Sequence, residues 1–198
     1  MKIYTGTGDD GTTGLLYGGR VGKDSAPIEA NGAVDEAQAA LGLVRAEVER
    51  GSELDLILVG LERDLYVLMA EIATAPANRP KLVAGTSLVT AEMVAALEGR
   101  IDQLSARHPP IKDFVIPGHD RVGAGLDLAR TITRRAERAA LAVFDPGGES
   151  NVLRYLNRLS DLLWTMARWQ EGGESVFSRR ADPSARGRRR KGSDGEGA

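Results

Sequence analysis

The chain has 198 residues, a formal net charge of −2 and no cysteine. This length fits one domain with a sizeable core. The lack of Cys excludes disulfides, thiolate zinc sites, iron–sulfur clusters and Cys nucleophiles, and two His residues leave little for a His-based metal centre. The N-terminus lacks the apolar segment of a secretory signal, and no stretch reaches the ~18 apolar residues of a membrane span. We therefore expect a cytoplasmic protein without membrane contact.

The charge is distributed unevenly along the chain. Residues 179–198 contain seven basic and three acidic residues, a charge of +4, so residues 1–178 carry −6. An acidic body argues against nucleic acid as the main ligand, because phosphate contacts need clustered Lys and Arg. The basic segment is rich in Gly and Ser and has no aliphatic residue larger than Ala, which predicts a disordered tail. A tail that binds RNA or a membrane is the alternative.

The first 27 residues are rich in glycine. Seven Gly fall between positions 6 and 22, interleaved with Thr and Asp, a composition typical of loops with exposed backbone N–H groups. Gly6-x-Gly8-x-x-Gly11 has the letters of a dinucleotide fingerprint, but no helix opens there and no βαβ unit follows. Residues 14–21 have Walker A spacing but place Arg and Val where Lys and Ser or Thr belong. Neither nucleotide-binding fold is predicted.

From residue 28 onward, apolar residues recur every three or four positions, which is the period of a helix. Five such stripes occur, over residues 30–48, 54–72, 93–104, 128–143 and 152–166. Pro and Gly lie in the loops between them. The pattern predicts an all-α domain over residues 28–178, folded as a five-helix up-and-down bundle. A di-iron bundle is excluded, because neither His lies in a Glu-x-x-His pair.

Three of the expected helices also carry a polar face opposite the apolar stripe. Its members are Asn31 and Asp35 in the first helix, Asp127, Arg130, Arg134, Glu137 and Arg138 in the fourth, and Asn157, Asp161 and Arg168 in the fifth. One interpretation is a solvated face held by ion pairs one turn apart. The other is an anion site, because stacked guanidinium groups suit phosphate oxygens. Asn157 favours a partner, since Asn is a poor mid-helix residue.

Phe114 lies in a loop between Pro110 and Pro117. Such a residue either plugs the end of a bundle or contacts a ligand. Together with the polar faces and the Gly-rich loop, it favours a phosphorylated ligand without naming it.

Six motifs follow one another in a recognisable order. They are Tyr4-Thr5-Gly6-Thr7-Gly8-Asp9-Asp10-Gly11, Gly18-Gly19-Arg20-Val21-x-Lys23-Asp24, Val34-Asp35-Glu36, Phe114-Val115-Ile116-Pro117-Gly118, Arg134-Arg135-Ala136-Glu137-Arg138 and Leu156-Asn157-Arg158-Leu159-Ser160-Asp161. Over roughly residues 3–183 the chain resembles the PduO-type ATP:cob(I)alamin adenosyltransferases, also called corrinoid adenosyltransferases.

The resemblance implies a homotrimer of five-helix bundles with active sites between neighbouring subunits. It implies that Co(I) of a reduced corrinoid attacks C5′ of ATP, giving adenosylcobalamin and triphosphate. ATP, Mg²⁺ and cobalamin are the implied cofactors and substrates. A corrinoid reductase and an adenosylcobalamin-dependent acceptor enzyme are the further implied partners, and no metal site made by the protein alone is implied.

The resemblance also implies residue roles on the nucleotide side. The ATP loop would consist of Thr5, Gly6, Thr7, Gly8, Asp9 and Gly11. Lys23 and Arg135 would contact the nucleotide, and Arg134 would bind the triphosphate. Glu137 and Asn157 would complete the surroundings of the nucleotide and its metal. Gly6 departs from the family pattern, in which a basic residue is common.

On the corrinoid side, Arg130 and Asp35 match a pair that forms a salt bridge across the subunit interface. Phe114 matches the aromatic residue that crowds the lower face of the corrin and excludes the axial base, which makes a four-coordinate Co(II) easier to reduce. Two other functions stay open: a non-catalytic nucleotide or corrinoid sensor on the same bundle, and a nucleic-acid-binding bundle that acts through its tail.

Overall fold

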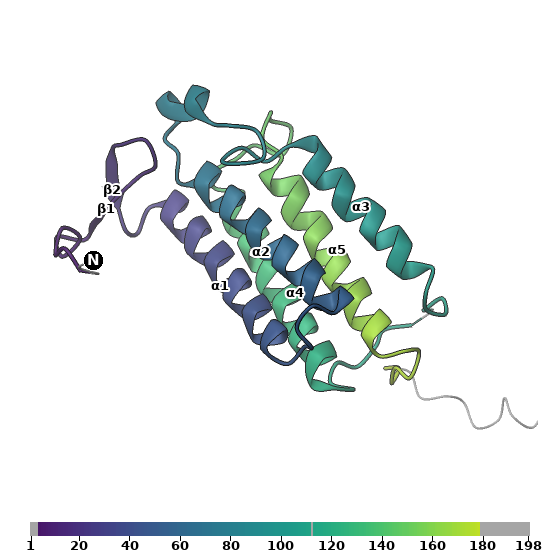
Figure 1. Ribbon diagram of the computed structural model, residues 1–198. Helices are drawn as coiled ribbons and strands as arrows, with labels where there is room; N and C mark the ends of the chain where they lie inside the picture. Colours follow the sequence, from purple (N-terminus) through teal and green to yellow (C-terminus); the bar gives the residue numbers. More distant parts are fainter. Residues whose placement is uncertain (1–3, 112, 179–198) are drawn as a thin grey trace, which may run out of the picture.

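The computed structural model describes residues 4–111 and 113–178. The expected basic tail, residues 179–198, lies outside the described residues. Five α-helices form the body of the protein: α1 (Ala26–Ala46), α2 (Glu53–Ile72), α3 (Ala91–Ser105), α4 (Arg121–Ala140) and α5 (Val152–Gln170). They run alternately in opposite directions, as Figure 1 shows. The predicted five-helix up-and-down bundle is therefore confirmed.

The helices begin where the sequence supplies the right end groups. The side chains of Ser52, Thr90 and Asp120 accept hydrogen bonds from backbone N–H groups three residues further on, at 3.2, 3.3 and 2.7 Å. Such caps satisfy N–H groups that have no partner within the helix. α1 starts at Ala26, two residues before the expected point. Pro27 in its first turn explains the difference, because proline fits there without losing a hydrogen bond.

The core lies along the shared axis of the bundle. α1 packs against α2 and α4, and α5 packs against α3 and α4. The side chains at the centre are completely buried, among them Leu41, Leu58, Leu65, Leu126 and Leu159. Each such side chain stabilises the fold by about 1.5–3 kcal/mol through removal from water.

A small antiparallel hairpin precedes the bundle. β1 (Thr12–Gly14) pairs with β2 (Arg20–Gly22), with Thr13 opposite Val21. Sequence periodicity did not predict these strands, since three residues are too few for an alternating pattern. The hairpin projects from the end of the bundle beside the start of α1 (Figure 1). The segment that follows α2, which includes a 3₁₀ helix (Pro76–Lys81), holds it through a hydrogen bond from the N–H of Leu16 to the carbonyl of Ala73 at 2.8 Å.

Among the described residues, no helix combines the length and the apolar composition that a membrane span requires.

Candidate functional site

The predicted ATP loop is an exposed series of turns ahead of the hairpin. Gly11 has φ +80°, a conformation that glycine adopts without strain, and its carbonyl accepts a hydrogen bond from the N–H of Lys23 at 2.9 Å. A Cβ on Gly8 would lie 3.2 Å from Nζ of Lys23. Glycine at position 8 thus lets the Lys23 ammonium lie against the backbone of the loop. The loop and a cation that could bind phosphate are therefore adjacent.

Arg20 fastens this loop to the hairpin. Its Nη2 donates to the carbonyl of Thr7 at 2.6 Å, and its Nε donates to Oγ1 of Thr12 at 3.0 Å. Asp10 accepts from the N–H and the hydroxyl of Thr12, and these hydrogen bonds lower the pKa of Asp10. The sequence pattern alone indicates no such role for Arg20, which stands out only as a member of the second motif.

On α4 and α5, Glu137 and Asn157 are brought together. Nδ2 of Asn157 donates to Oε1 of Glu137 at 3.1 Å, and Oδ1 of Asn157 accepts from Nη1 of Arg158 at 3.0 Å. The amide is therefore held in one orientation. The expectation that Asn157 has a partner is confirmed. These three residues line a pocket of about 270 Å³, together with Glu98 of α3 and Arg154 of α5.

Arg158 connects this pocket to α3. It donates to Asp161 at 2.7 Å and to Glu98 at 3.1 Å, and the hydrogen bond with Asp161 raises the pKa of Arg158. Arg158 lies in the sixth motif, which by itself indicates no function for it. Its hydrogen bond to Oδ1 of Asn157 holds that amide in place.

Arg134 and Arg135, two neighbouring arginines in the second half of α4, have different surroundings. Arg134 is exposed, three residues before Glu137 and thus on the same side of the helix. Its carbonyl accepts a hydrogen bond from Arg138 at 3.0 Å. Arg135 instead forms an ion pair with Glu36 of α1. Of the two, Arg134 is better placed to reach a ligand beside Glu137.

Phe114 lies at the edge of a second pocket, of about 540 Å³, at the other end of the molecule. Its side chain is 82% exposed, so the interpretation that it plugs the end of the bundle is wrong. The pocket is also lined by Asp127, Arg130, Trp164 and Arg168. The structure therefore brings Phe114 and Arg130, two predicted corrinoid-side residues, to one pocket.

Two members of the expected polar faces are in fact buried. Asp127 and Arg168 are 4% and 2% exposed, and they bind each other at 2.6 Å. The guanidinium of Arg168 also lies over the ring of Trp164, 5.8 Å from its centroid. A wheel drawn for one helix could not reveal this burial, because each charge is neutralised by a residue on the neighbouring helix.

Asp35 and Arg130 have separate environments within one chain. Asp35 is exposed on α1, whereas Nε of Arg130 donates to Oδ1 of Asp127 at 3.2 Å. The contacts of the described residues therefore do not join the two as a pair inside the subunit.

The two halves of the predicted nucleotide site are also apart in one chain. The hairpin and its loop project beside the start of α1, on the side of the bundle away from α3 and α5 (Figure 1). The pocket of Glu137 and Asn157 is lined by residues of α3, α4 and α5. The loop accordingly does not cover the Glu137–Asn157 pocket of its own subunit.

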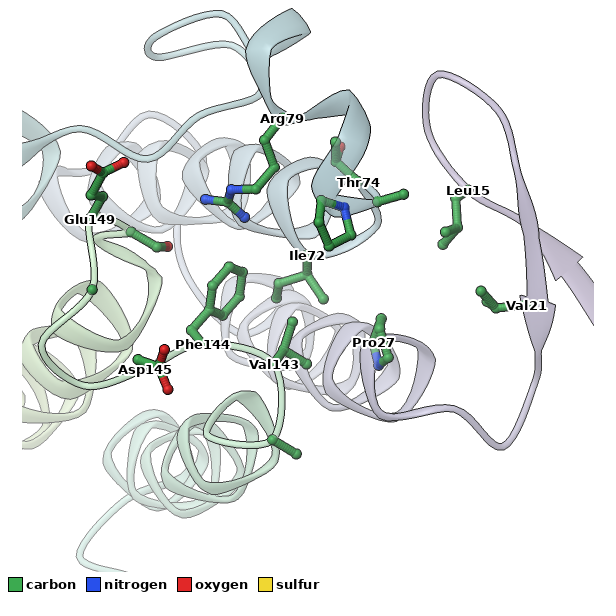
Figure 2. A pocket seen from close by; sticks show the side chains of 15 residues that line it. Leu15, Val21, Pro27, Ile72, Thr74, Arg79, Val143, Phe144, Asp145 and Glu149 are labelled. Atoms are coloured by element: carbon green, nitrogen blue, oxygen red, sulfur yellow. The ribbon is translucent and has the colours of Figure 1, made fainter.

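A third pocket, of about 520 Å³, lies between the hairpin and the end of the bundle. Figure 2 shows Leu15 and Val21 of the hairpin facing Pro27 of α1 across it. Arg79 lies 5.3 Å from the ring centroid of Phe144 and binds Glu71 at 2.8 Å. None of the predicted site residues lines this pocket. Its walls join the base of the hairpin to the bundle.

Comparisons with known proteins all indicate the same family. The cobalamin adenosyltransferase family matches residues 3–170. A corrinoid adenosyltransferase from Citrobacter freundii is 42% identical over 175 residues, which cover 86% of this chain and 95% of the relative. One from Bacillus subtilis is 40% identical over 172 residues, covering 85% of this chain and 86% of the relative.

Solved structures give the same result. A variant PduO-type ATP:corrinoid adenosyltransferase from Lactobacillus reuteri, complexed with cobalamin and ATP, superposes with a TM-score of 0.79 at 28% identity. The match covers 91% of this chain and 98% of that one. With the family match extending over most of the sequence, the chain belongs to the cobalamin adenosyltransferase family.

Proposed function

We propose that this protein transfers the 5′-deoxyadenosyl group of ATP to Co(I) of a reduced corrinoid, giving adenosylcobalamin and triphosphate. The observation that carries the proposal is the pocket in which Glu137 and Asn157 are hydrogen-bonded to each other beside cationic side chains. Because Arg158 is paired with Glu98 and Asp161, Arg154 is the lining cation that can meet an anion, and Glu137 offers a carboxylate to a metal ion. The reaction itself is inferred from the cobalamin adenosyltransferase family, to which the chain belongs.

The proposed reaction needs no nucleophilic side chain from the protein. The corrinoid substrate supplies the nucleophile, so the chain must position two substrates and stabilise the charge that grows on triphosphate. Arg134 supplies a bidentate donor for phosphate oxygens, and Lys23 supplies a second cation from the loop. The loop of Thr5, Gly6, Thr7, Gly8, Asp9 and Gly11 adds backbone N–H groups, whereas Arg135 is engaged by Glu36 and would have to leave that ion pair to contact the nucleotide.

Magnesium fits this pocket as a companion of the nucleotide. Mg²⁺ keeps several waters and needs only one or two protein carboxylates when phosphates bind it. In the described part of the chain no cluster of three His, Asp or Glu side chains could hold a metal alone. Glu137 would hold the ion together with the phosphates, and the ion would neutralise charge on the leaving group.

Phe114 and the pocket beneath it form the corrinoid side of the proposal. An exposed ring at the edge of a pocket that Val115, Pro117 and Trp164 also line offers an apolar surface to the lower face of a corrin. There it would keep the axial base away from cobalt.

The proposal includes a homotrimer whose active sites lie between subunits. It is supported by the separation, within one chain, of the loop from the Glu137–Asn157 pocket. It is also supported by Asp35, which is exposed and available to Arg130 of the partner subunit. The domain division at residues 27 and 178, a cytoplasmic location, a corrinoid reductase and an acceptor enzyme belong to the same proposal.

One assay tests the activity. The purified chain is incubated with ATP, Mg²⁺ and chemically reduced cobalamin, and both products are quantified. We expect adenosylcobalamin and triphosphate in equal amounts. Binding of both substrates without product would indicate the non-catalytic sensor. Nucleic-acid binding that is lost on deletion of residues 184–198 would favour the second alternative.

A further inference from the structure

Buried charges link α4 to the chain beyond α5 at the end of the bundle that carries Phe114. Nη2 of Arg168 donates to Oδ2 of Asp127 at 2.6 Å and to Oε1 of Glu171 at 2.8 Å. The three residues are 2%, 4% and 3% exposed. Buried charges persist only when they are paired, so each of these side chains depends on its neighbours for its position.

One end of this network is Arg130. The second carboxylate oxygen of Asp127, Oδ1, accepts from Nε of Arg130 at 3.2 Å. A guanidinium has five N–H donors in a fixed plane, so binding at Nε leaves its terminal amino groups for a second carboxylate. In the proposed trimer that carboxylate is Asp35 of the partner subunit. Asp127 thereby sets the direction in which Arg130 meets the interface.

The other end is the Phe114 loop. Oε2 of Glu171 accepts from the hydroxyl of Ser175 at 2.6 Å. The backbone at 176–178 then pairs with the loop: the N–H of Ile116 donates to the carbonyl at 176, and the carbonyl of Phe114 accepts from the N–H at 178, both at 2.8 Å. The position of the loop is thus tied, bond by bond, to Glu171.

Both ends of the network meet at the pocket beneath Phe114. Asp127, Arg130 and Arg168 line its wall. Nε of Arg168 is buried and has no hydrogen-bond partner among the described residues. A ligand in this pocket would therefore contact both the buried charge network and the ring of Phe114.

We propose that Asp127, Arg168 and Glu171 are positioning residues that fix the Phe114 loop and Arg130 relative to each other. They would couple the subunit interface to the lower face of the bound corrinoid. The inference rests on the proposed function, because it takes the corrinoid as the occupant of the pocket. Neither Asp127 nor Arg168 needs to touch a reacting atom for this role.

Two variants interrupt the network at different points, and a third serves as control. Asp127→Asn removes the charge between the two arginines, and Ser175→Ala removes the last hydrogen bond before the loop. Asp55→Asn is the matched control, because Asp55 is also buried, at 5% exposed, and accepts from an arginine, Nε of Arg45, at 2.8 Å. It lies at the start of α2 and does not line the Phe114 pocket.

The readouts are the dissociation constants of Co(II) cobalamin and of ATP, and the absorption spectrum of the bound Co(II) corrinoid. We expect Asp127→Asn and Ser175→Ala to weaken corrinoid binding about tenfold or more and to lower the four-coordinate fraction. ATP binding should stay within about twofold, because the nucleotide pocket is not part of the network. Asp55→Asn should change only the melting temperature.

Wild-type corrinoid affinity and spectrum in Ser175→Ala would overturn the proposal, even if Asp127→Asn failed to fold. Equal weakening of both substrates, or the same loss in Asp55→Asn, would also overturn it, since that is the behaviour of a purely structural network. Binding and spectrum are read without turnover. A wild-type chain that makes no adenosylcobalamin would contradict the proposed function, and these readouts would still decide the positioning role.

Discussion

Asn157 of α5 donates a hydrogen bond to Glu137 of α4, with 3.1 Å between Nδ2 and Oε1. The carbonyl oxygen of the same amide accepts from Arg158, so the carboxylate of Glu137 is held by a donor that cannot rotate freely. We predict that Asn157→Ala raises the KM for ATP and lowers kcat, together about 1–3 kcal/mol in kcat/KM. Steady-state kinetics with ATP varied will measure the change.

Ser52→Ala is the control for that variant. The hydroxyl of Ser52 caps α2 by accepting from the N–H of Asp55 at 3.2 Å, outside the pocket. It should lower the melting temperature and leave kcat/KM unchanged. Equal kinetic losses in the two variants would show that Asn157 acts only through stability.

Arg134 is exposed, so its removal should cost little stability. We predict that Arg134→Ala lowers kcat about 10²- to 10³-fold, because a charge-assisted contact is lost where charge develops on triphosphate. Arg134→Lys should recover only part of the rate, since an ammonium lacks the planar fork of donors. Arg121→Ala, near the opposite end of α4, should behave as wild type. A wild-type kcat for Arg134→Ala would remove Arg134 from the site.

The sequence predicts some elements of the fold better than others. The stripes over 54–72 and 152–166 predicted α2 and α5 correctly, because a long helix repeats its period several times. The hairpin of Thr12–Gly14 with Arg20–Gly22 was missed, since short strands have no period to detect.

The site was predicted to a smaller extent. Asp127 and Arg168 were placed on outward faces, because a single helix carries no information about the partner that neutralises a charge. The sequence indicates no roles for Arg20 and Arg158, because their hydrogen bonds are made to neighbouring groups of the protein that only the fold brings into reach. The role of Arg134 came from the order of motifs, because its spacing alone fits a solvated surface equally well.

Phe114 contributes little to folding, with 82% of its side chain exposed. Phe114→Ala should therefore keep the melting temperature and the KM for ATP. We predict that it loses the four-coordinate Co(II) spectrum and at least about tenfold in kcat, or roughly 1.4 kcal/mol. Tyr66→Ala, which removes an aromatic that is 65% exposed on α2, is the control. A four-coordinate spectrum in Phe114→Ala would contradict the proposed role of the ring.

A substitution of Asp35 tests the proposed interface between subunits. Asp35→Asn removes the charge that is available to Arg130 of the partner subunit, so we predict weaker corrinoid turnover or a less stable trimer. Light scattering across a concentration series and the KM for cobalamin will detect either change. Glu49→Gln, another exposed carboxylate on the surface of the chain, should alter neither. An unchanged mass together with unchanged kinetics in Asp35→Asn argues against the interfacial pair.

Asp64 makes the stability of the bundle depend on pH. It accepts a hydrogen bond from Tyr155 at 2.8 Å, and burial raises the pKa of Asp64 above its usual value. Between the ordinary and the raised pKa, Asp64 is protonated in the folded chain but ionised in the unfolded chain. The stabilisation that this proton gives the folded state is complete below pH about 4 and is lost as the pH rises through the raised pKa.

We predict that the free energy of unfolding of Asp64→Asn increases relative to that of wild type as the pH rises from 4 to 7, because the amide never ionises. Urea unfolding at both pH values will measure the difference. Asp102→Asn, an exposed position on α3, should show no such change. A constant difference between wild type and Asp64→Asn at the two pH values would contradict a raised pKa.

The most direct test of the account is complementation between two inactive chains. Lys23→Ala disables the loop and Arg134→Ala disables the helical half, and each homotrimer should be nearly inactive. After unfolding together and refolding, random trimers would contain both intact halves at about a quarter of their interfaces. We predict that adenosylcobalamin synthesis recovers to about that fraction of wild type. No recovery, in trimers shown by mass spectrometry to contain both variants, would contradict an active site assembled from two subunits.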